Sequence, residues 1–368
     1  MKLKYIQILL ASLLIITLIK CKKEEGNFID YVNDNYIATP YQLQIPVGFP
    51  EMDIPADNPF TVEGVKLGRH LFYDPILSRD STISCGSCHR QEVAFSDSPK
   101  QFSTGIDNQK SKRNAMPLFN LAWYPSLFWD GRAANIELQA LHPVSASDEM
   151  DLEWQVAVER VQSNHFYIDF FEKAFPNQTI DSLLIIDAIG QFERTLISHQ
   201  SKYDSVILGT AAFTKDEFEG FLLVNEQDKG NCLHCHTTDA DALGTTRKFA
   251  NNGLDFVRKV EDFKDLGKGG FSKKNSDMGL FKIPSLRNVA LTPPYMHDGR
   301  FETLEEVVHF YNKKVQLSPT LDKRMTIQQQ KTIQLTPKEE RQIVVFLHTL
   351  SDFAFTKDEA FSNPFKNK

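Results

Sequence analysis

Two short segments of the sequence share one spacing of reactive side chains. Each has two cysteines separated by two residues and a histidine directly after the second cysteine: Cys85, Cys88 and His89 in the first, and Cys232, Cys235 and His236 in the second. Two thiols at this spacing can add to the vinyl groups of one haem while the adjacent imidazole coordinates its iron, the attachment pattern of c-type haems. The sequence therefore predicts two covalently bound haems, with His89 and His236 as iron ligands.

Other uses of paired cysteines explain the pattern less well. The chain has five cysteines, and the two motifs use four of them, which leaves only Cys21. A zinc site would not explain a histidine directly after each second cysteine. A redox dithiol of the thioredoxin type would need a surrounding βαβ pattern, and none is visible. We therefore interpret both motifs as haem attachment sites.

The composition is that of a globular protein with room for two domains. The chain has 368 residues, of which 41% are hydrophobic and 24% are charged. Its formal net charge of -7 gives no electrostatic support to nucleic-acid binding. We therefore exclude nucleic acid as a partner.

Residues 1–20 have the pattern of a secretory signal peptide. Two lysines precede an apolar run over residues 6–19, which is shorter than the roughly 18 apolar residues of a membrane-spanning helix. Cys21 follows this run and resembles the lipidated cysteine of bacterial lipoproteins, although Lys20 departs from the small residue usual before it. We expect an exported, periplasmic lipoprotein anchored to the membrane at Cys21, with residues 21–44 as a lipid-anchored or flexible tether. Simple signal cleavage is the alternative.

Apolar spacing and capping residues predict a mostly helical chain. Apolar periodicity predicts helices over residues 61–72, 154–175 and 182–200. Thr214 and Thr336 are each followed three residues later by a glutamate, which is the capping-box signature of a helix N-terminus. We expect helices to begin at both positions.

The segment after the first haem motif contains candidate catalytic side chains. A haem that splits peroxide needs an open iron position and a nearby acid–base group. Glu149 is a candidate acid–base group, Gln139 a hydrogen-bond donor and Trp129 an electron relay. Spacing alone is weak evidence for each, because a tryptophan is usually part of a core and paired acidic residues usually begin a solvated helix.

A family resemblance strengthens these assignments. The sequence FWDGRAA at residues 128–134, followed by Gln139, Pro143 and Glu149, resembles the peroxidatic-domain motif of bacterial di-haem cytochrome c peroxidases. The resemblance implies that Trp129 lies between the two haems and that Gln139 and Glu149 line the distal peroxide pocket. It also implies that Pro143 lies close to the open face of the iron.

The resemblance spans about residues 45–352 and implies the fold. We expect a mainly α protein with two cytochrome-c-like domains, each with one covalently bound c-type haem. The N-terminal peroxidatic haem domain would occupy residues 45–212 and the C-terminal electron-transfer haem domain residues 213–355. Residues 356–368 would form a tail.

One feature of many family members is missing from the sequence. They have a histidine in the loop before the segment that corresponds to residues 113–115, where it caps the resting peroxidatic iron. No histidine occurs between residues 90 and 112 here. We therefore expect the first haem iron to be five-coordinate, or to hold only water, and to need no reductive activation.

The sixth ligand of the second haem has two candidates. Met296 suits the chemistry, because His/Met ligation gives a high-potential electron-transfer haem. The resemblance favours Tyr311, which corresponds to the ligand methionine of the peroxidases and to a tyrosine in the subgroup similar to the methylamine-utilisation di-haem maturase. Such a maturase completes a tryptophan-derived quinone on a partner protein. Tyrosine ligation would favour ferric iron and lower its potential.

The resemblance also implies one calcium ion between the domains. The Asn114 side chain and the carbonyl groups of Thr292 and Pro294 would hold it. Amide and carbonyl oxygens are ligands that suit calcium.

Three functions stay open, and the first is favoured. The resemblance implies a peroxidase that reduces hydrogen peroxide to water with electrons from a small c-type cytochrome or another periplasmic donor. The first alternative is a di-haem oxidase, similar to the maturase, that modifies a protein or small-molecule partner through high-valent iron. The second is a non-enzymatic di-haem electron carrier. A distal pocket with Gln139, Pro143 and Glu149 argues against the carrier.

Overall fold

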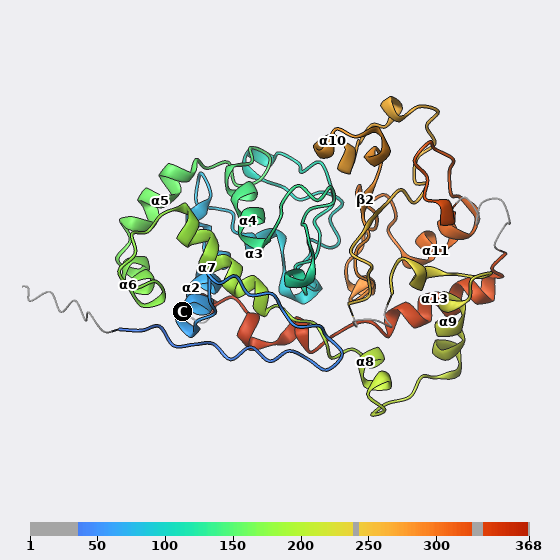
Figure 1. Ribbon diagram of the computed structural model, residues 1–368, viewed down its shortest axis with the longest axis horizontal. Helices are drawn as coiled ribbons and strands as arrows, with labels where there is room; N and C mark the ends of the chain where they lie inside the picture. The colour runs from blue at the N-terminus through green and yellow to red at the C-terminus, as the bar shows by residue number, and fades with distance from the viewer. Residues whose placement is uncertain (1–35, 238–242, 326–333, 367–368) are drawn as a thin grey trace, which may run out of the picture. The chain divides into compact units, whose positions relative to one another are not determined.

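Helices make up most of the regular structure, as the sequence predicts. The computed structural model describes residues 36–237, 243–325 and 334–366 (Figure 1). Its α-helices are α2 (Val62–Tyr73), α3 (Cys85–Cys88), α4 (Ile136–Ser145), α5 (Trp154–Gln162), α6 (His165–Ala174), α7 (Ser182–Thr195), α8 (Lys202–Ile207), α9 (Lys215–Asn225), α10 (Lys268–Ser272), α11 (Leu304–Lys313) and α13 (Pro337–His348). Two short antiparallel strands, β1 (Phe249–Ala250) and β2 (Phe281–Lys282), pair Phe249 with Lys282. The prediction of a mainly α fold is confirmed.

The predicted signal peptide and Cys21 lie outside the described residues. Within the described ranges, no helix has both the length and the apolar character needed to cross a membrane. The chain from Ile37 to Lys368 forms one compact unit. The division into haem domains at residue 212 therefore stays a prediction.

Both predicted capping boxes are confirmed. The Thr214 hydroxyl accepts a hydrogen bond from the backbone N–H of Glu217, whose carboxylate accepts one from the backbone N–H of Thr214 at 2.6 Å. Thr336 and Glu339 do the same at the start of α13. These reciprocal bonds satisfy backbone donors that the first helical turn leaves free.

Two predicted helices differ from the structure in their extent. The helix predicted over residues 154–175 is two helices, because Asn164 leaves the helical conformation and its side chain caps α6 by accepting a hydrogen bond from the Phe166 N–H. The helix predicted over residues 182–200 ends at Thr195. The residues after it bond to the carboxylate of Asp352 instead of continuing the helix.

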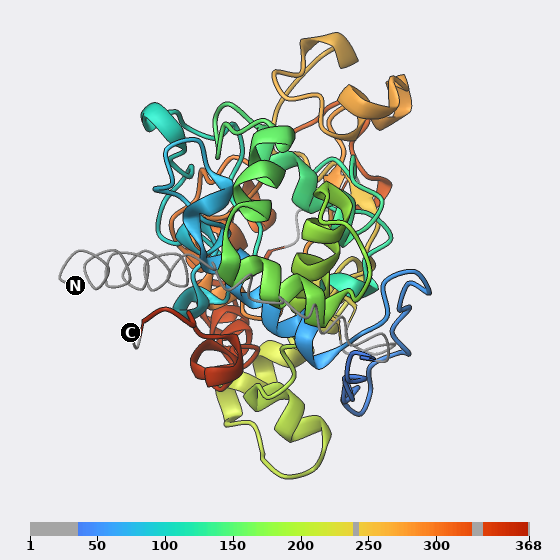
Figure 2. The same ribbon diagram turned by 90° about the vertical axis from the view of Figure 1, so that its left-hand side faces the viewer.

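In the N-terminal half, α2 packs closely against α7 (Figures 1 and 2). Gly68 permits this approach, because a Cβ there would lie 1.8 Å from the Ala188 carbonyl oxygen. Leu67 and Leu71 of α2 then share a buried core with Ile185 of α7. The same core includes residues of α4, α5 and α6, so the helices around α7 form one packed layer of apolar side chains.

In the C-terminal half, α9 packs against α13 in a similar way. A Cβ at Gly220 would lie 2.0 Å from the Gln342 carbonyl oxygen, so glycine allows the two helices to meet. Val224, Ile343 and Phe346 are buried together in this contact. The apolar clusters around α7 and around α13 are thus separate.

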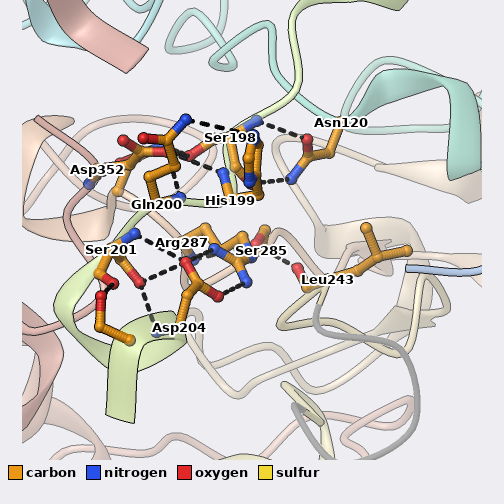
Figure 3. A network of polar contacts seen from close by, with 12 residues as sticks. Asn120, Ser198, His199, Gln200, Ser201, Asp204, Leu243, Ser285, Arg287 and Asp352 are labelled. Carbon is orange, nitrogen blue, oxygen red and sulfur yellow. Dashed lines mark hydrogen bonds and ion pairs between the residues drawn. The ribbon is translucent and has the colours of Figure 1, made fainter. Parts of the chain in front are cut away.

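A buried polar network connects residues 198–200 with the C-terminal part of the chain (Figure 3). One carboxylate oxygen of Asp352 accepts hydrogen bonds from the Ser198 hydroxyl at 3.0 Å and from the backbone N–H groups of His199 and Gln200 at 2.8 and 2.9 Å. Asn120 completes the network: its side chain accepts a hydrogen bond from the Ser198 N–H and donates one to the Ser198 carbonyl oxygen. An ionised acceptor with several buried donors is a strong interaction.

We expect Asp352→Ala to lower the free energy of unfolding by about 3 kcal/mol, because it leaves buried donors without an acceptor. Urea unfolding monitored by circular dichroism measures this loss. Asp358→Ala is the matched control, because the Asp358 carboxylate accepts one exposed bond from the Ala360 N–H. That substitution should cost less than about 1 kcal/mol. Equal losses for the two variants would contradict the importance of the network.

Candidate functional site

The first haem motif forms a short helix whose start is fixed by its own side chains. Ser84 and Ser87 form a capping box before and within α3. A Cβ at Gly86 would lie 2.4 Å from a ring carbon of Tyr73, so glycine allows the motif to pack against the end of α2. Cys85 and Cys88 form no disulfide. Burial raises the pKa of the Cys85 thiol well above its usual value.

The His89 side chain is oriented as an iron ligand must be. Its Nδ1 donates a hydrogen bond to the Phe95 carbonyl oxygen at 2.9 Å, which leaves Nε2 free to coordinate a metal. Burial lowers the pKa of His89, so the imidazole stays neutral. Free thiols beside a neutral, oriented imidazole fit covalent haem attachment.

A cavity of about 1240 Å³ joins this motif to the predicted catalytic residues. Cys85, Cys88 and His89 line one part of it, and Gln139, Pro143 and Glu149 line another. Trp129 also lines the cavity, so the structure brings all four predicted catalytic residues to one site. Gln139 and Pro143 lie on α4, whereas Glu149 lies in the turn after it.

Glu149 is positioned by its backbone. Its N–H donates to the Ala146 carbonyl oxygen at 3.0 Å, and its own carbonyl oxygen accepts from the Ile106 N–H at 2.8 Å. Gly105 allows this contact, because a Cβ there would lie 2.3 Å from the Asp148 carbonyl oxygen. Burial, and secondarily the charge of Asp148, raises the pKa of Glu149. A raised pKa makes the carboxylate a better proton acceptor than an exposed one.

His142 also lines the cavity, but its side chain is exposed. Its ring meets the Phe128 ring edge-on at 5.3 Å between centroids. Burial lowers the pKa of His142, and the charge of Arg132 lowers it further. It therefore faces the cavity as a neutral side chain.

Trp129 connects the first cavity with the C-terminal half. Its indole N–H donates to the Asn114 carbonyl oxygen at 2.9 Å, and its own carbonyl oxygen accepts from the Lys282 N–H at 2.8 Å. The next residue, Asp130, accepts a bond from Arg113 at 2.7 Å. Arg113 also pairs with both carboxylate oxygens of Asp265, at 2.7 and 2.8 Å.

The second haem motif repeats the arrangement at His236. Its Nδ1 donates to the Pro284 carbonyl oxygen at 2.9 Å, which leaves Nε2 free. Burial lowers the pKa of His236 to about 4. Cys232 and Cys235 are also without a disulfide. His234 lies between the two cysteines and is exposed, so we assign it no ligand role.

Both candidates for the sixth ligand of the second haem lie in one apolar cluster. The Asn252 side-chain N–H₂ donates to the Tyr311 oxygen at 3.0 Å and approaches the Met296 sulfur at 3.5 Å. The electrostatic influence of Cys232 and Cys235 reaches the Tyr311 hydroxyl group, whose pKa burial raises to about 12. The choice of Tyr311 over Met296 stays a prediction.

The predicted calcium ligands come from two segments that touch. The Asn114 N–H donates to the His297 carbonyl oxygen at 2.8 Å, which brings Asn114 beside the segment with Thr292 and Pro294. The Asn114 side-chain N–H₂ donates to the Gln101 carbonyl oxygen at 3.1 Å, so its Oδ1 is the free end of the amide. Among the described residues, no group of three or more His, Cys, Asp or Glu side chains suits a metal. Calcium binding stays a prediction.

Comparison with known proteins assigns the family. A family model described as di-haem cytochrome c peroxidase matches residues 62–212. The methylamine utilization protein MauG of Methylorubrum extorquens is 35% identical over 300 residues, which cover 80% of each chain. The chain belongs to the di-haem cytochrome c peroxidase family.

Two further relatives show the breadth of this family. The cytochrome c551 peroxidase of Nitrosomonas europaea is 33% identical over 306 residues, 82% of this chain and 84% of that one. A solved structure of a MauG-like protein associated with microbial copper homeostasis shares 32% identity, with a TM-score of 0.78 over 89% of this chain and 100% of that one. Membership in the di-haem peroxidase family implies two c-type haems.

Sequence reasoning missed two buried charged residues that line the same cavity. Lys282 is 3% exposed, its ammonium lies 4.4 Å from the Tyr124 ring centroid, and burial lowers its pKa to about 7. Glu193 is also 3% exposed. Glu193 lies four residues after Ile189 and therefore on the same buried face of its helix. An acidic residue on a buried face was the signal that the sequence offered for Glu193. Nothing in the sequence marks Lys282.

We expect the double variant Cys85→Ala and Cys88→Ala to lose one of the two c-type haems implied by the family. Intact-mass measurement and the pyridine haemochrome assay report the loss. Cys21→Ala is the control, because Cys21 belongs to neither motif. A full complement of haem in the double variant would refute attachment at this site.

Proposed function

We propose that this protein reduces hydrogen peroxide to water with electrons from a small c-type cytochrome or a similar periplasmic donor. The observation that supports this most directly is the single cavity shared by His89 with Gln139, Pro143 and Glu149. An electron carrier has no need of an acid–base group in a cavity beside its iron ligand. Relatives named cytochrome c peroxidase add support at about 30% identity.

His89 would hold the first haem, and the bound haem would supply the iron that takes part in peroxide reduction. Glu149 would move a proton from one peroxide oxygen to the other. Its raised pKa suits this role, because the carboxylate must take up a proton before it can return it. The Gln139 amide would hold peroxide by a hydrogen bond, and Pro143 would limit the space beside it.

Trp129 would couple the two haem sites. Its hydrogen bonds reach Asn114 on one side and Lys282 on the other, so the ring is fixed where the two halves meet. The second haem, at His236, would receive electrons from the donor. Export to the periplasm, with a lipid anchor at Cys21, would bring the protein to such a donor.

We expect Glu149→Gln to lower kcat for peroxide reduction roughly 10²–10⁴-fold, because it removes the acid–base group. In the unsubstituted protein, activity should rise as pH increases through the raised pKa of Glu149, since the ionised form accepts the first proton. This acid limb should disappear in the variant. Stopped-flow oxidation of reduced cytochrome c by peroxide measures both effects.

Glu153→Gln is the matched control for this experiment. Glu153 is an exposed neighbour before α5, and its side chain makes no cap bond. The control should retain full turnover. Equal turnover in Glu149→Gln, or an unchanged pH profile, would contradict the proposed role.

A second candidate function is oxidation of a protein or small-molecule partner. Two observations favour it: no histidine lies between residues 90 and 112 to cap the first iron, and the relatives include proteins named MauG. Adding peroxide to the fully oxidised protein separates the candidates. Rapid oxidation of cytochrome c afterwards supports the peroxidase, a long-lived oxidised state that cytochrome c quenches poorly supports the oxidase, and no spectral change indicates a carrier.

We also propose Tyr311 as the sixth ligand of the second haem. Its oxygen, held by Asn252, lies close enough to the second motif for Cys232 and Cys235 to influence its pKa. An anionic oxygen ligand would favour ferric iron. This ligation would make the second haem a weaker store of reducing electrons.

We expect Tyr311→Phe to raise the reduction potential of one haem and to change its spin state, because an anionic ligand is removed. Potentiometric titration and electron paramagnetic resonance measure these changes. Met296→Leu is the control and should leave the spectra unchanged. The opposite pattern, with a change only in Met296→Leu, would assign ligation to Met296.

A further inference from the structure

Glu193 is a buried carboxyl group that forms no ion pair with any of the described residues. It lies on α7, it is 3% exposed, and its Oε2 has no hydrogen-bond partner among the described residues. The adjacent Arg194 does not neutralise it, because both terminal nitrogens of Arg194 bond the carboxylate of Glu137. Carboxyl groups are rarely buried unless they are paired.

The side chain of Glu193 faces the cavity at the first haem motif. Ile189, one helical turn earlier, lines the same cavity, so this face of α7 forms part of its wall. Glu193 also lies close enough to Cys85 to raise the pKa of its thiol. The thioether that Cys85 would form with a haem has no hydrogen-bond donor to offer the carboxyl group.

The cavity gives Glu193 a route to solvent protons. Lys112, His142 and Arg300 line the same cavity and are exposed. Glu149 lines it as well. Glu193 is therefore buried but open to a space that reaches the surface.

The surroundings of Glu193 disfavour its charged form. The pKa of Glu193 is raised to about 8, chiefly by burial and also by the charge of Glu137, against the opposing charge of Arg194. The titratable groups on the helices packed against α7 have other contacts. On α2, His70, Tyr73 and Arg69 bond backbone carbonyls, Glu63 bonds Thr39 and the Lys66 ammonium lies over the Phe170 ring. On α4, Glu137 bonds Arg194 and His142 packs against Phe128; on α5, Arg160 bonds the carbonyls of residues 76, 78 and 79 and Glu159 bonds Gln155. The segment Leu121–Trp123, which also packs against α7, has no titratable side chain.

We propose that Glu193 is a second acid–base site of this cavity, which takes up a proton when the haem attached at Cys85 and Cys88 is reduced and releases it on oxidation. The electron comes from the external donor, and the proton comes from solvent and converts the carboxylate to the acid. Reduction removes one positive charge from the iron, so a nearby carboxylate binds a proton more tightly in the reduced state. The inference depends on haem attachment alone and does not require peroxide reduction.

Potentiometric titration of the holoprotein between about pH 5 and pH 9 tests the proposal. One haem potential should fall as pH rises, because the proton that accompanies the electron becomes scarcer. In Glu193→Gln, which keeps the shape of the side chain, this slope should vanish while the other haem potential is unchanged. Glu149→Gln should keep the slope, because it leaves the Glu193 carboxyl group in place. A slope that survives in Glu193→Gln, or that is lost in Glu149→Gln, overturns the proposal.

Redox-difference infrared spectroscopy gives an independent readout. Reduction of the unsubstituted protein and of Glu149→Gln should increase the carboxylic-acid C=O band, with a shift in D₂O. Glu193→Gln should lack this signal, whereas Glu193→Asp should retain a displaced one. If Glu193→Gln fails to fold with both haems, the absence of the band in Glu149→Gln still overturns the proposal, and its presence together with a displaced band in Glu193→Asp supports it.

Discussion

The position of Trp129 is the constraint on which the site depends most. Its indole N–H bonds the Asn114 carbonyl oxygen, and its own carbonyl oxygen bonds the backbone of Lys282. Because these bonds use backbone groups of both halves, the tryptophan cannot move without displacing a wall of the first cavity. Arg113 strengthens the contact by pairing with Asp130 and Asp265. The wall of the first cavity at Trp129 and the segments that contain Lys282 and Asp265 are thus held together by these bonds.

The buried acidic groups of the N-terminal half are of two kinds. Glu137 is buried with Arg194, and this pairing more than offsets the effect of burial, so the pKa of Glu137 is lowered. Glu149 and Glu193 line the cavity without an ion pair in the described residues, and burial raises the pKa of each. A carboxyl group that has a fixed cation is structural, whereas one left unpaired beside a cavity is free to exchange protons.

The two haem motifs are alike in how they orient histidine. His89 and His236 each donate Nδ1–H to a backbone carbonyl oxygen and keep Nε2 for iron. They differ in what faces them. The first motif shares its cavity with Glu149, whereas the second lies near the apolar cluster of Tyr311. The proposed division of roles between the haems rests on these different surroundings more than on the motifs themselves.

The sequence by itself determined what depends on local chemistry: the haem motifs, the capping boxes at Thr214 and Thr336, and the mainly α class. It misjudged the helix over residues 182–200, because its end depends on the distant carboxylate of Asp352. It also missed Glu193, since burial without a partner is decided by what packs around a side chain. Only the tertiary structure brought residues more than fifty positions apart into one cavity, because packing of separate helices is not encoded in any local spacing.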